Sequence, residues 1–423
     1  MKKNILLFPC GSEVALEAYR SLEHSIHFNL IGASSVDDHG KFVFENYIGD
    51  LPNIQDENFI ATLKKIVQEY QIDAILPAMD AVIYEIKKQE SELGCKVISS
   101  SLETVTLCNS KQKTYKKLKD CIKLPKQYDT LDEVTHYPVF LKPDVGYGSR
   151  NVLKATNFEE ASSFLDTHSD MLILEFLPGK EYTIDCFSDF NSNLLFVGAR
   201  ERKRVNNGIS VNTATLALEA RFYELATKIS KEISFNGAWF FQVKEDVNGA
   251  LTLLEIASRI GGSSSLYRAK GINFVQLSIF NIFEQKVEIL ENNFHVELDR
   301  ALDAIYKIDM QFNHVYVDLD DTLLVDNKVN HKLVGQLYSF INSGKKIHLI
   351  TKHIHNLEET LLKFRLNSLF DSLIHLEKTD KKSDYIKNND AIFIDDSFAE
   401  RKDVFQKLNI PVFGLDIICS VVY

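Results

Sequence analysis

The chain has 423 residues, of which 45% are hydrophobic and 25% are charged. This length exceeds what one hydrophobic core usually serves, so we expect two or three domains. The composition argues against disordered, collagen-like and membrane-array proteins. The 48 basic and 59 acidic residues give a net charge of −11, which disfavours general binding to nucleic acid or to an anionic membrane.

Two further observations favour a cytoplasmic protein. The apolar run after the basic start, Ile5 to Phe8, is too short for a secretory signal, and no stretch approaches the ~18 apolar residues of a membrane span. The six cysteines contain no C-x-x-C pair. We therefore expect reduced thiols rather than a zinc site or a disulfide framework.

The first part of the chain alternates short apolar runs with helical patterns. Strands are predicted at 5–8, 28–32 and 74–77, and helices at 13–23 and 59–70. Because strands that alternate with helices build parallel sheets, the pattern predicts an α/β domain. We assign residues 1–108 to it.

The pattern of predicted helices and strands changes twice further along the chain. Hairpin-like strands are predicted at 137–142, 172–176, 182–188 and 238–244, which is typical of an α+β domain, here 109–311. A second α/β alternation begins at Val315 and is predicted to form a small domain over 312–423.

The most informative segment of the middle domain is a predicted hairpin. Asn248-Gly249 lies between alternating apolar runs, which predicts a two-residue turn and places Gln242 opposite Glu255. Opposed side chains share one face of a sheet, so two oxygen ligands converge there as Mg²⁺ requires. Arg259 and the glycine-serine run 261–265 follow, and they offer a guanidinium and backbone amides to a phosphate or a carboxylate.

Other residues of this domain fit a nucleotide site less specifically. Lys142 ends a strand and precedes a turn with Gly146 and Gly148, where backbone amides can approach phosphate oxygens. Taken alone, a strand-turn-strand segment with two glycines is more often an ordinary hairpin. Glu175 and Glu181 flank a Pro-Gly turn. These acids either contact the ribose hydroxyls and the adenine amine of a nucleotide or are solvated on the surface.

The densest basic run covers residues 200–204 and is followed by 205–208. We expect either a solvated loop or a mobile lid over a triphosphate or an acid substrate.

In this order, the residues resemble the ATP-grasp superfamily, and residues 1–108 resemble the pre-ATP-grasp domain of its carbamoyl-phosphate-synthase-like members. The resemblance covers about residues 1 to 310 and implies binding of ATP and of Mg²⁺, with Mn²⁺ as an alternative. It implies phosphate contacts from Lys111, Lys142 and the Gly146–Gly148 turn, adenine and ribose contacts from Glu175 and Glu181, metal ligation by Gln242 and Glu255, and contact of Arg259 with the transferred phosphate.

One position departs from that family. Many relatives read Glu-x-Asn-Pro-Arg, whereas this chain reads Glu255-Ile256-Ala257-Ser258-Arg259. An alanine cannot ligate a metal, so the number of metal ions, one or two, stays open.

The C-terminal segment places polar residues at the ends of three predicted strands. Asp318 and Asp320 follow the first, Thr351 ends the second, and Asp395-Asp396 follow the third. In a parallel doubly wound sheet these strand ends meet at one edge. Acids so close together repel one another, which favours a bound cation.

These positions, with Lys382, resemble the four motifs of the haloacid-dehalogenase-like (HAD) phosphatases. No gap between them has room for an inserted cap domain, and the neighbouring His353 and His355 are expected to be exposed loop residues. The resemblance implies Asp318 as nucleophile and metal ligand, Asp320 as general acid/base and metal ligand, Thr351 and Lys382 as phosphate-binding groups, Asp395 as metal ligand, and Asp396 as an assisting phosphate-site residue.

Together the two resemblances imply a bifunctional enzyme, an ATP-dependent carboxylate-amine ligase fused to a capless phosphatase. Its partners would be a small-molecule carboxylate, an amine and a phosphate ester, with no nucleic acid and no membrane, and a homodimer is compatible with the sequence. Two alternatives stay open: a carbamoyl-phosphate-synthase-like carboxylate kinase, and a nucleotide-sensing or scaffolding module with a degenerate ligase site.

Overall fold

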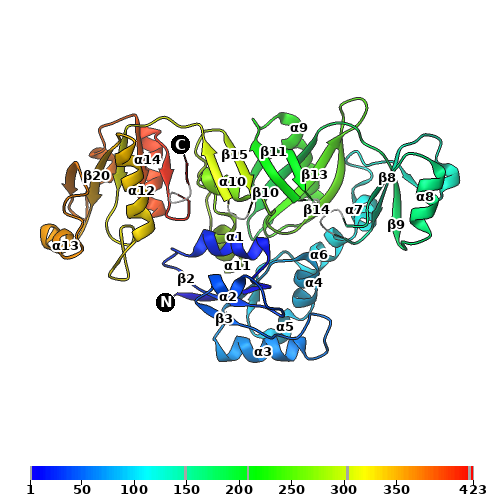
Figure 1. The fold of residues 1–423 in the computed structure, drawn as a ribbon, viewed down its shortest axis with the longest axis horizontal. Coiled ribbons are helices and arrows are strands. Elements are labelled where there is room, and N and C mark those ends of the chain that lie inside the picture. The colour runs from blue at the N-terminus through cyan, green and yellow to red at the C-terminus, as the bar shows by residue number, and fades with distance from the viewer. Residues whose placement is uncertain (1, 147–149, 207–208, 302–303, 418–420, 423) are drawn as a thin grey trace.

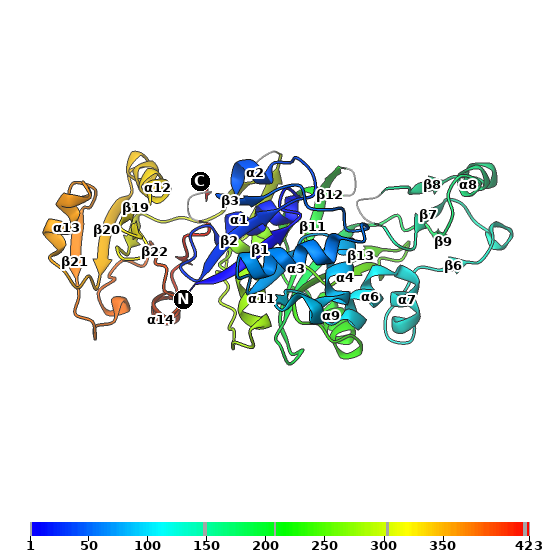
Figure 2. The same ribbon diagram turned by 90° about the horizontal axis from the view of Figure 1, so that it is seen from below.

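The computed structural model describes residues 2–146, 150–206, 209–301, 304–417 and 421–422. The N-terminal residues form a layer beside a large central sheet, and the C-terminal sheet and a small four-stranded sheet lie at opposite ends of the molecule (Figures 1 and 2). Among the helices of these residues, none has the length and apolar character that crossing a membrane requires.

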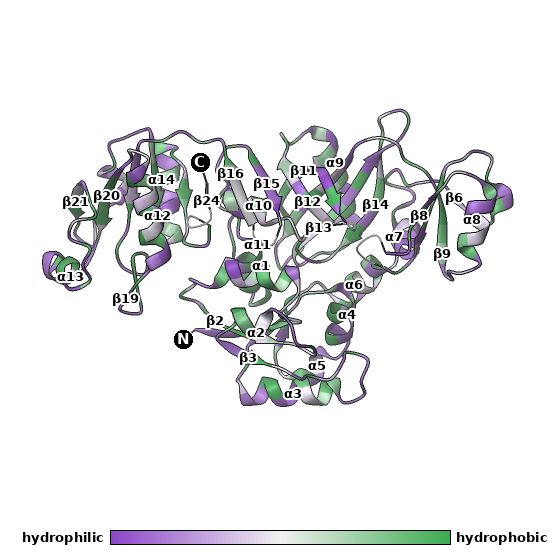
Figure 3. Cartoon of the chain, in the orientation of Figure 1, coloured by the Kyte–Doolittle hydropathy of each residue, from purple (hydrophilic) through white to green (hydrophobic). Residues whose placement is uncertain are grey.

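The N-terminal unit is the predicted α/β fold. Its parallel sheet has the order β3-β2-β1-β4-β5. The apolar face of α3 explains its packing, because Phe59, Leu63, Ile66 and Val67 are buried, whereas hydrophilic residues are confined to other positions of the helix (Figure 3). The elements are β1 (Lys3–Phe8), α1 (Glu13–Leu22), β2 (Phe28–Ala33), α2 (Gly40–Val43), β3 (Asn46–Ile48), α3 (Phe59–Glu69), β4 (Ala74–Pro77), α4 (Asp80–Lys88), α5 (Glu90–Leu93) and β5 (Lys96–Val97).

A four-stranded sheet of order β6-β9-β7-β8 follows two connecting helices. Ser110 caps α7 by accepting from the Lys113 amide, and this cap fixes Lys111 as the first residue of the helix. The elements are α6 (Leu102–Asn109), α7 (Lys111–Leu118), β6 (Gln127–Tyr128), β7 (Val139–Pro143), β8 (Leu153–Ala155), α8 (Phe158–Leu165) and β9 (Met171–Glu175).

The central sheet has eight strands in the order β14-β13-β10-β11-β12-β15-β16-β24. Phe235, Trp239 and Phe241 stack in the core between this sheet and α9. The elements are β10 (Glu181–Ser188), β11 (Leu194–Asn206), β12 (Ile209–Thr215), α9 (Ala220–Glu232), β13 (Gly237–Glu245), β14 (Leu251–Ala257), α10 (Ser265–Ala269), α11 (Phe274–Ile282), β15 (Val296–Arg300), β16 (Ala304–Ile308) and β24 (Val421–Val422).

The basic run 200–204 is not a solvated loop, because it forms part of a strand. It belongs to β11, which pairs with β10 and β12. Arg200 is buried and donates to Asp185 at 2.6 Å, so an ion pair inside the sheet neutralises its charge. Of the segment 205–208, Val205 and Asn206 end the same strand, and 207–208 lie outside the described residues.

The C-terminal residues form a parallel sheet of order β21-β20-β17-β22-β23. The last strand, β24, leaves this sheet and pairs with β16 of the central one. The segment between β17 and β20 holds a short hairpin and α12. The elements are β17 (His314–Val317), β18 (Leu324–Val325), β19 (Lys328–Val329), α12 (His331–Asn342), β20 (Lys346–Thr351), α13 (Leu357–Lys363), β21 (Ser372–His375), β22 (Ala391–Ile394), α14 (Phe398–Leu408) and β23 (Val412–Phe413).

Buried polar contacts dock this unit on the rest of the chain. The side chain of Asn292, 1% exposed, donates to the Val412 carbonyl at 2.8 Å and accepts from the Val412 amide at 3.1 Å. Arg268 of α10 donates to Glu17 of α1 and to the Asp416 carbonyl. One arginine thus touches all three parts of the chain.

Candidate functional site

The predicted pairing across the β13–β14 hairpin is confirmed, although the predicted turn is wrong. Gln242 lies opposite Glu255, whereas nearer the turn Val243 lies opposite Leu253. The loop between Asp246 and Ala250 is therefore one residue longer than a two-residue turn, and a bulge at Leu254 restores the pairing. The longer loop and the bulge shift the strand register by one residue in opposite directions, so Gln242 and Glu255 are paired as predicted.

The bulge has a second consequence. Its carbonyl, that of Leu254, accepts hydrogen bonds from Lys142 Nζ at 2.9 Å and from the Tyr115 hydroxyl at 2.8 Å. Lys142 Nζ also donates to the Tyr115 oxygen at 3.0 Å. Burial lowers the pKa of Lys142 to about 8.

Lys142 and Leu254 line a cavity of about 240 Å³ between the four-stranded sheet and the central sheet. The described residues predicted to contact the nucleotide border it, except Arg259, and Gly148 lies outside the described residues. The cavity brings together Lys111, Lys142, Gly146, Glu175, Glu181, Gln242 and Glu255.

Several of these side chains are held by neighbours. Arg202 donates to both Glu181 and Gln242 Oε1, and so joins the predicted ribose contact to a predicted metal ligand. The Glu175 carboxylate accepts from the Lys126 amide at 2.9 Å. Arg202 comes from the basic run that sequence reasoning assigned to a loop or lid.

A second cavity of about 490 Å³ adjoins the first. It shares Lys111, Arg202, Gln242 and Glu255 with the first cavity, and extends to the N-terminal unit. Its other borders include Ala257, Arg259, the glycines at 261 and 262, and Ser12 at the start of α1. The two cavities therefore meet at the predicted metal ligands.

Arg259 is held in this second cavity by a residue that the sequence did not suggest. Its Nε and one terminal nitrogen each donate to Asp80 at 2.7 Å, in a bidentate ion pair. Asp80 is the first residue of α4 in the N-terminal unit. The N-terminal unit thus fixes the guanidinium predicted to contact the transferred phosphate.

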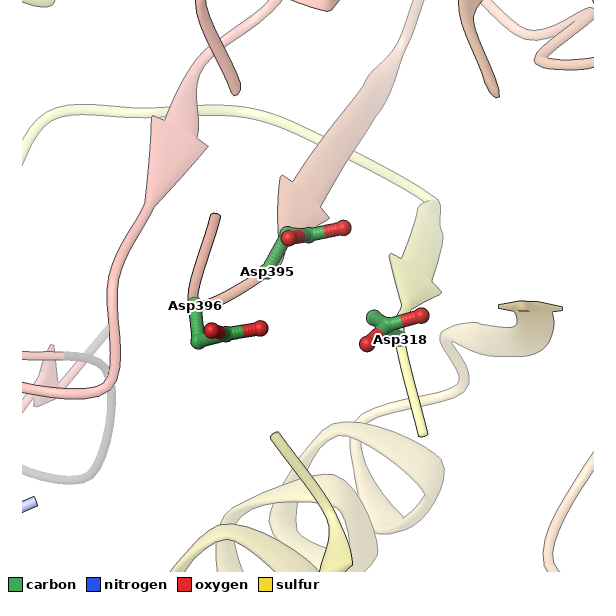
Figure 4. A group of neighbouring side chains, drawn as sticks. All are labelled: Asp318, Asp395 and Asp396. Atoms are coloured by element: carbon green, nitrogen blue, oxygen red, sulfur yellow. The ribbon is translucent and has the colours of Figure 1, made fainter. Parts of the chain in front are cut away.

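The second candidate site lies at the carboxyl edge of the C-terminal sheet. Asp318 follows β17 and Asp395 follows the neighbouring β22, and together with Asp396 they surround one space (Figure 4). Each residue offers a carboxylate oxygen, and these oxygens lie within 4.8 Å of one another. An all-oxygen donor set of this size fits a hard cation such as Mg²⁺ after a small inward shift.

Lys382 lies between the first two acids. Its Nζ contacts Asp318 at 2.5 Å and Asp395 at 2.6 Å, and all three side chains are buried. Burial, followed by repulsion from Asp395, raises the pKa of Asp318, and burial raises that of Asp395. Burial alone would lower the pKa of Lys382, but attraction to both acids outweighs it and raises this pKa.

The remaining predicted residues of this site are distributed differently from expectation. Asp320, predicted as a metal ligand, is outside the cluster, and its half-exposed side chain contacts His353 instead. Asp396, predicted at the phosphate, belongs to the cluster, and burial raises its pKa to about 6. Thr351 ends β20 and is buried. The expectation that His353 is exposed is wrong, because 6% of its side chain is accessible.

Comparison with known proteins assigns the fold of the larger part of the chain. Residues 167–303 match the family described as "ATP-grasp in the biosynthetic pathway with Ter operon". A search of curated protein sequences finds no match.

Many solved structures are similar. One is the biotin carboxylase domain dimer of Hydrogenobacter thermophilus 2-oxoglutarate carboxylase with MgADP, ADP and bicarbonate (TM-score 0.61, 17% identity, 71% of this chain and 74% of that one). Others are biotin carboxylase from Campylobacter jejuni in a β,γ-ATP complex (0.60, 19%, 71% and 76%) and an L-amino acid ligase from Bacillus licheniformis (0.58, 18%, 71% and 79%). The chain therefore has an ATP-grasp fold.

Proposed function

We propose that this protein is an ATP-dependent ligase that joins a carboxylate to an amine. The observation that carries the proposal is the meeting of two cavities at Gln242 and Glu255. The first cavity offers the lysines and acids that suit ATP. The second offers Arg259 and a glycine run that suit a substrate carboxylate.

The chemistry follows from the charges around these cavities. An oxygen of the substrate carboxylate attacks the γ-phosphorus of ATP and ADP leaves, which gives an acyl phosphate. The amine nitrogen then attacks the acyl carbon, inorganic phosphate leaves, and the nitrogen loses a proton. Lys142 and Arg259 would hold the phosphates in line and balance their charge, which is the main requirement of phosphoryl transfer.

Gln242 and Glu255 fit the role of metal ligands. Both offer oxygen donors at directly paired positions, and Arg202 fixes the Gln242 oxygen by donating to it at 2.7 Å. When bound, Mg²⁺ supplies positive charge beside the phosphate oxygens, and Mn²⁺ has the same ligand preference. The similar biotin carboxylase structure contains MgADP, which supports Mg²⁺ as the ion that accompanies the nucleotide.

A substrate matrix tests the ligase. ADP and phosphate release are measured for many acids, each with and without amines, and we expect ADP release that depends on both. ADP release from an acid alone would favour a carboxylate kinase. Nucleotide binding without any turnover would favour a sensing module, for which Ala257 is the supporting residue because it removes one family metal ligand.

We further propose that the C-terminal unit is a Mg²⁺-dependent phosphatase of the HAD type. Its support is the buried arrangement of Lys382 between Asp318 and Asp395, beside Asp396. A carboxylate oxygen of Asp318 would attack phosphorus while Asp320 gives a proton to the departing alcohol. Water, losing a proton to Asp320, would then attack the phosphorus of the aspartyl phosphate, which releases inorganic phosphate and restores the Asp318 carboxylate.

Lys382 has a clear part in this reaction. Its ammonium group stabilises the buried acids and lies where an incoming phosphate would meet Asp318. When bound, Mg²⁺ supplies further positive charge for Asp318, Asp395 and Asp396. Release of phosphate from an aryl phosphate in the presence of Mg²⁺, and its loss with a chelator, test the phosphatase independently of the ligase.

Fusion of the two activities suggests consecutive steps on one metabolite. A phosphorylated amine could be ligated first and dephosphorylated afterwards, or the reverse. Phosphate release from the purified ligation product, compared with that from the free amine phosphate, decides the order.

A further inference from the structure

The C-terminal site contains a buried histidine that its proposed chemistry does not yet use. His353 Nδ1 lies 2.9 and 3.0 Å from the two carboxylate oxygens of Asp320, and His353 Nε2 lies 2.9 Å from the Thr360 hydroxyl. Asp320 and Thr360 are therefore joined through the imidazole ring of His353.

The contact with Asp320 fixes one proton of the ring. A carboxylate oxygen can only accept, so Nδ1 carries a proton and donates to Asp320. The hydroxyl of Thr360 on α13 both donates and accepts, so it pairs with Nε2 in the neutral ring and in the imidazolium. In either state both ring nitrogens have a hydrogen-bond partner.

The ring is fixed from several sides. The His353 amide donates to Thr351 Oγ1 at 3.2 Å, and the His353 carbonyl accepts from His375 Nε2 at 2.7 Å. Its side chain is 6% exposed, whereas that of Asp320 is 52% exposed. Asp320 is therefore an exposed carboxylate held by a buried, immobile donor.

We infer that His353 is the positioning residue for Asp320. The inference rests on the proposed phosphatase, in which Asp320 gives a proton to the leaving group. An exposed aspartate samples several rotamers, and proton transfer needs the carboxyl group within hydrogen-bond reach of the leaving oxygen. The bond to His353 restricts the rotamers of Asp320, which lies two residues after Asp318 in the chain.

Leaving-group dependence tests the inference. An alkyl phosphate needs a proton donor for its departing oxygen, whereas a nitrophenyl phosphate leaves as a stable anion. With Mg²⁺ present, we expect His353→Ala to lower kcat/KM by about 10- to 100-fold for the alkyl ester and by less than about 3-fold for the nitrophenyl ester. Asp320→Asn should show the same selective loss, to a greater extent.

Two further variants separate positioning from a structural role. His353→Asn keeps a side-chain N–H near Nδ1, so it should recover part of the alkyl-ester activity. His355 is exposed and meets the His353 ring edge-on, with centroids 5.5 Å apart, so His355→Ala is the matched control and should keep both activities. Equal losses for both esters in His353→Ala would overturn the inference. Failure of the parent enzyme to hydrolyse either ester would instead refute the proposed phosphatase, and the inference with it.

Discussion

Replacement of Lys142 by methionine is the sharpest test of the proposed nucleotide cavity. The ammonium group has three donor hydrogens, and two are used by the Tyr115 oxygen and the Leu254 carbonyl. Among the described residues, this leaves one donor hydrogen for a phosphate oxygen. A hydrogen bond to a charged group contributes about 1.5–3 kcal/mol, so Lys142→Met should weaken binding of Mg·ATP by about 10- to 150-fold.

The pH dependence makes the same test more specific. Because burial lowers the pKa of Lys142 to about 8, the side chain of the free protein is charged below that pH and neutral above it. Phosphate binds the charged form better, so the dissociation constant of the parent should rise as pH increases through 8, by at most tenfold per unit. The variant lacks this group, and its dissociation constant should stay flat over the same range.

Isothermal titration calorimetry with Mg·ATP between pH 7 and pH 9.5 measures both effects. Lys123→Met is a suitable control, because that lysine pairs with Asp246 and does not border the cavity. Affinities that agree within threefold, or parallel pH profiles in parent and Lys142→Met protein, would remove Lys142 from the nucleotide site.

Three further outcomes are expected. Glu255→Gln should weaken Mg·ATP binding strongly while phosphatase activity is unchanged, and a loss of both activities would indicate unfolding instead. Asp318→Asn should abolish hydrolysis of an aryl phosphate and leave Mg·ATP binding intact, so residual hydrolysis at the parental rate would exclude Asp318 as nucleophile. Asn292→Ala leaves the buried amide and carbonyl of Val412 without their partner, at a cost of about 1–3 kcal/mol for each group. Amides of β22 and β23 should then exchange hydrogen faster, whereas the exposed Asn293→Ala should not change them.

Local sequence patterns predicted those strands that carry a clear apolar signal, whereas β11, whose second half is basic, was not predicted. β4 begins and ends where predicted, and β10 differs by one residue. The predicted pairing of Gln242 with Glu255 was correct for a partly wrong reason, since a longer loop and a bulge compensate. Turn chemistry alone does not reveal a bulge, because the bulge depends on what the freed carbonyl contacts, here Lys142 and Tyr115.

The missed residues share a different cause. Asp80 reaches Arg259 from another unit of the chain, and His353 reaches Asp320 from the neighbouring strand end. No local pattern marks either pair, because each partner is an ordinary polar residue in its own segment. The position of Arg200 was predicted wrongly for a related reason. A basic run is normally solvated, and Arg200 is buried only because Asp185 inside the sheet neutralises its charge.

The docking contacts limit how the two proposed sites can cooperate. The C-terminal sheet and the sheet of β7–β9 lie at opposite ends of the molecule (Figures 1 and 2). Bringing them together would require the C-terminal unit to leave Arg268 and Asn292, whose polar groups are buried against Asp416 and Val412. Unpaired buried groups of this kind cost several kcal/mol. The C-terminal unit should therefore keep its contacts with the rest of the chain through turnover. A metabolite processed at both sites would therefore have to leave the ligase cavities and diffuse to the C-terminal carboxylate cluster, and fusion would act by keeping the sites on one molecule rather than by direct transfer.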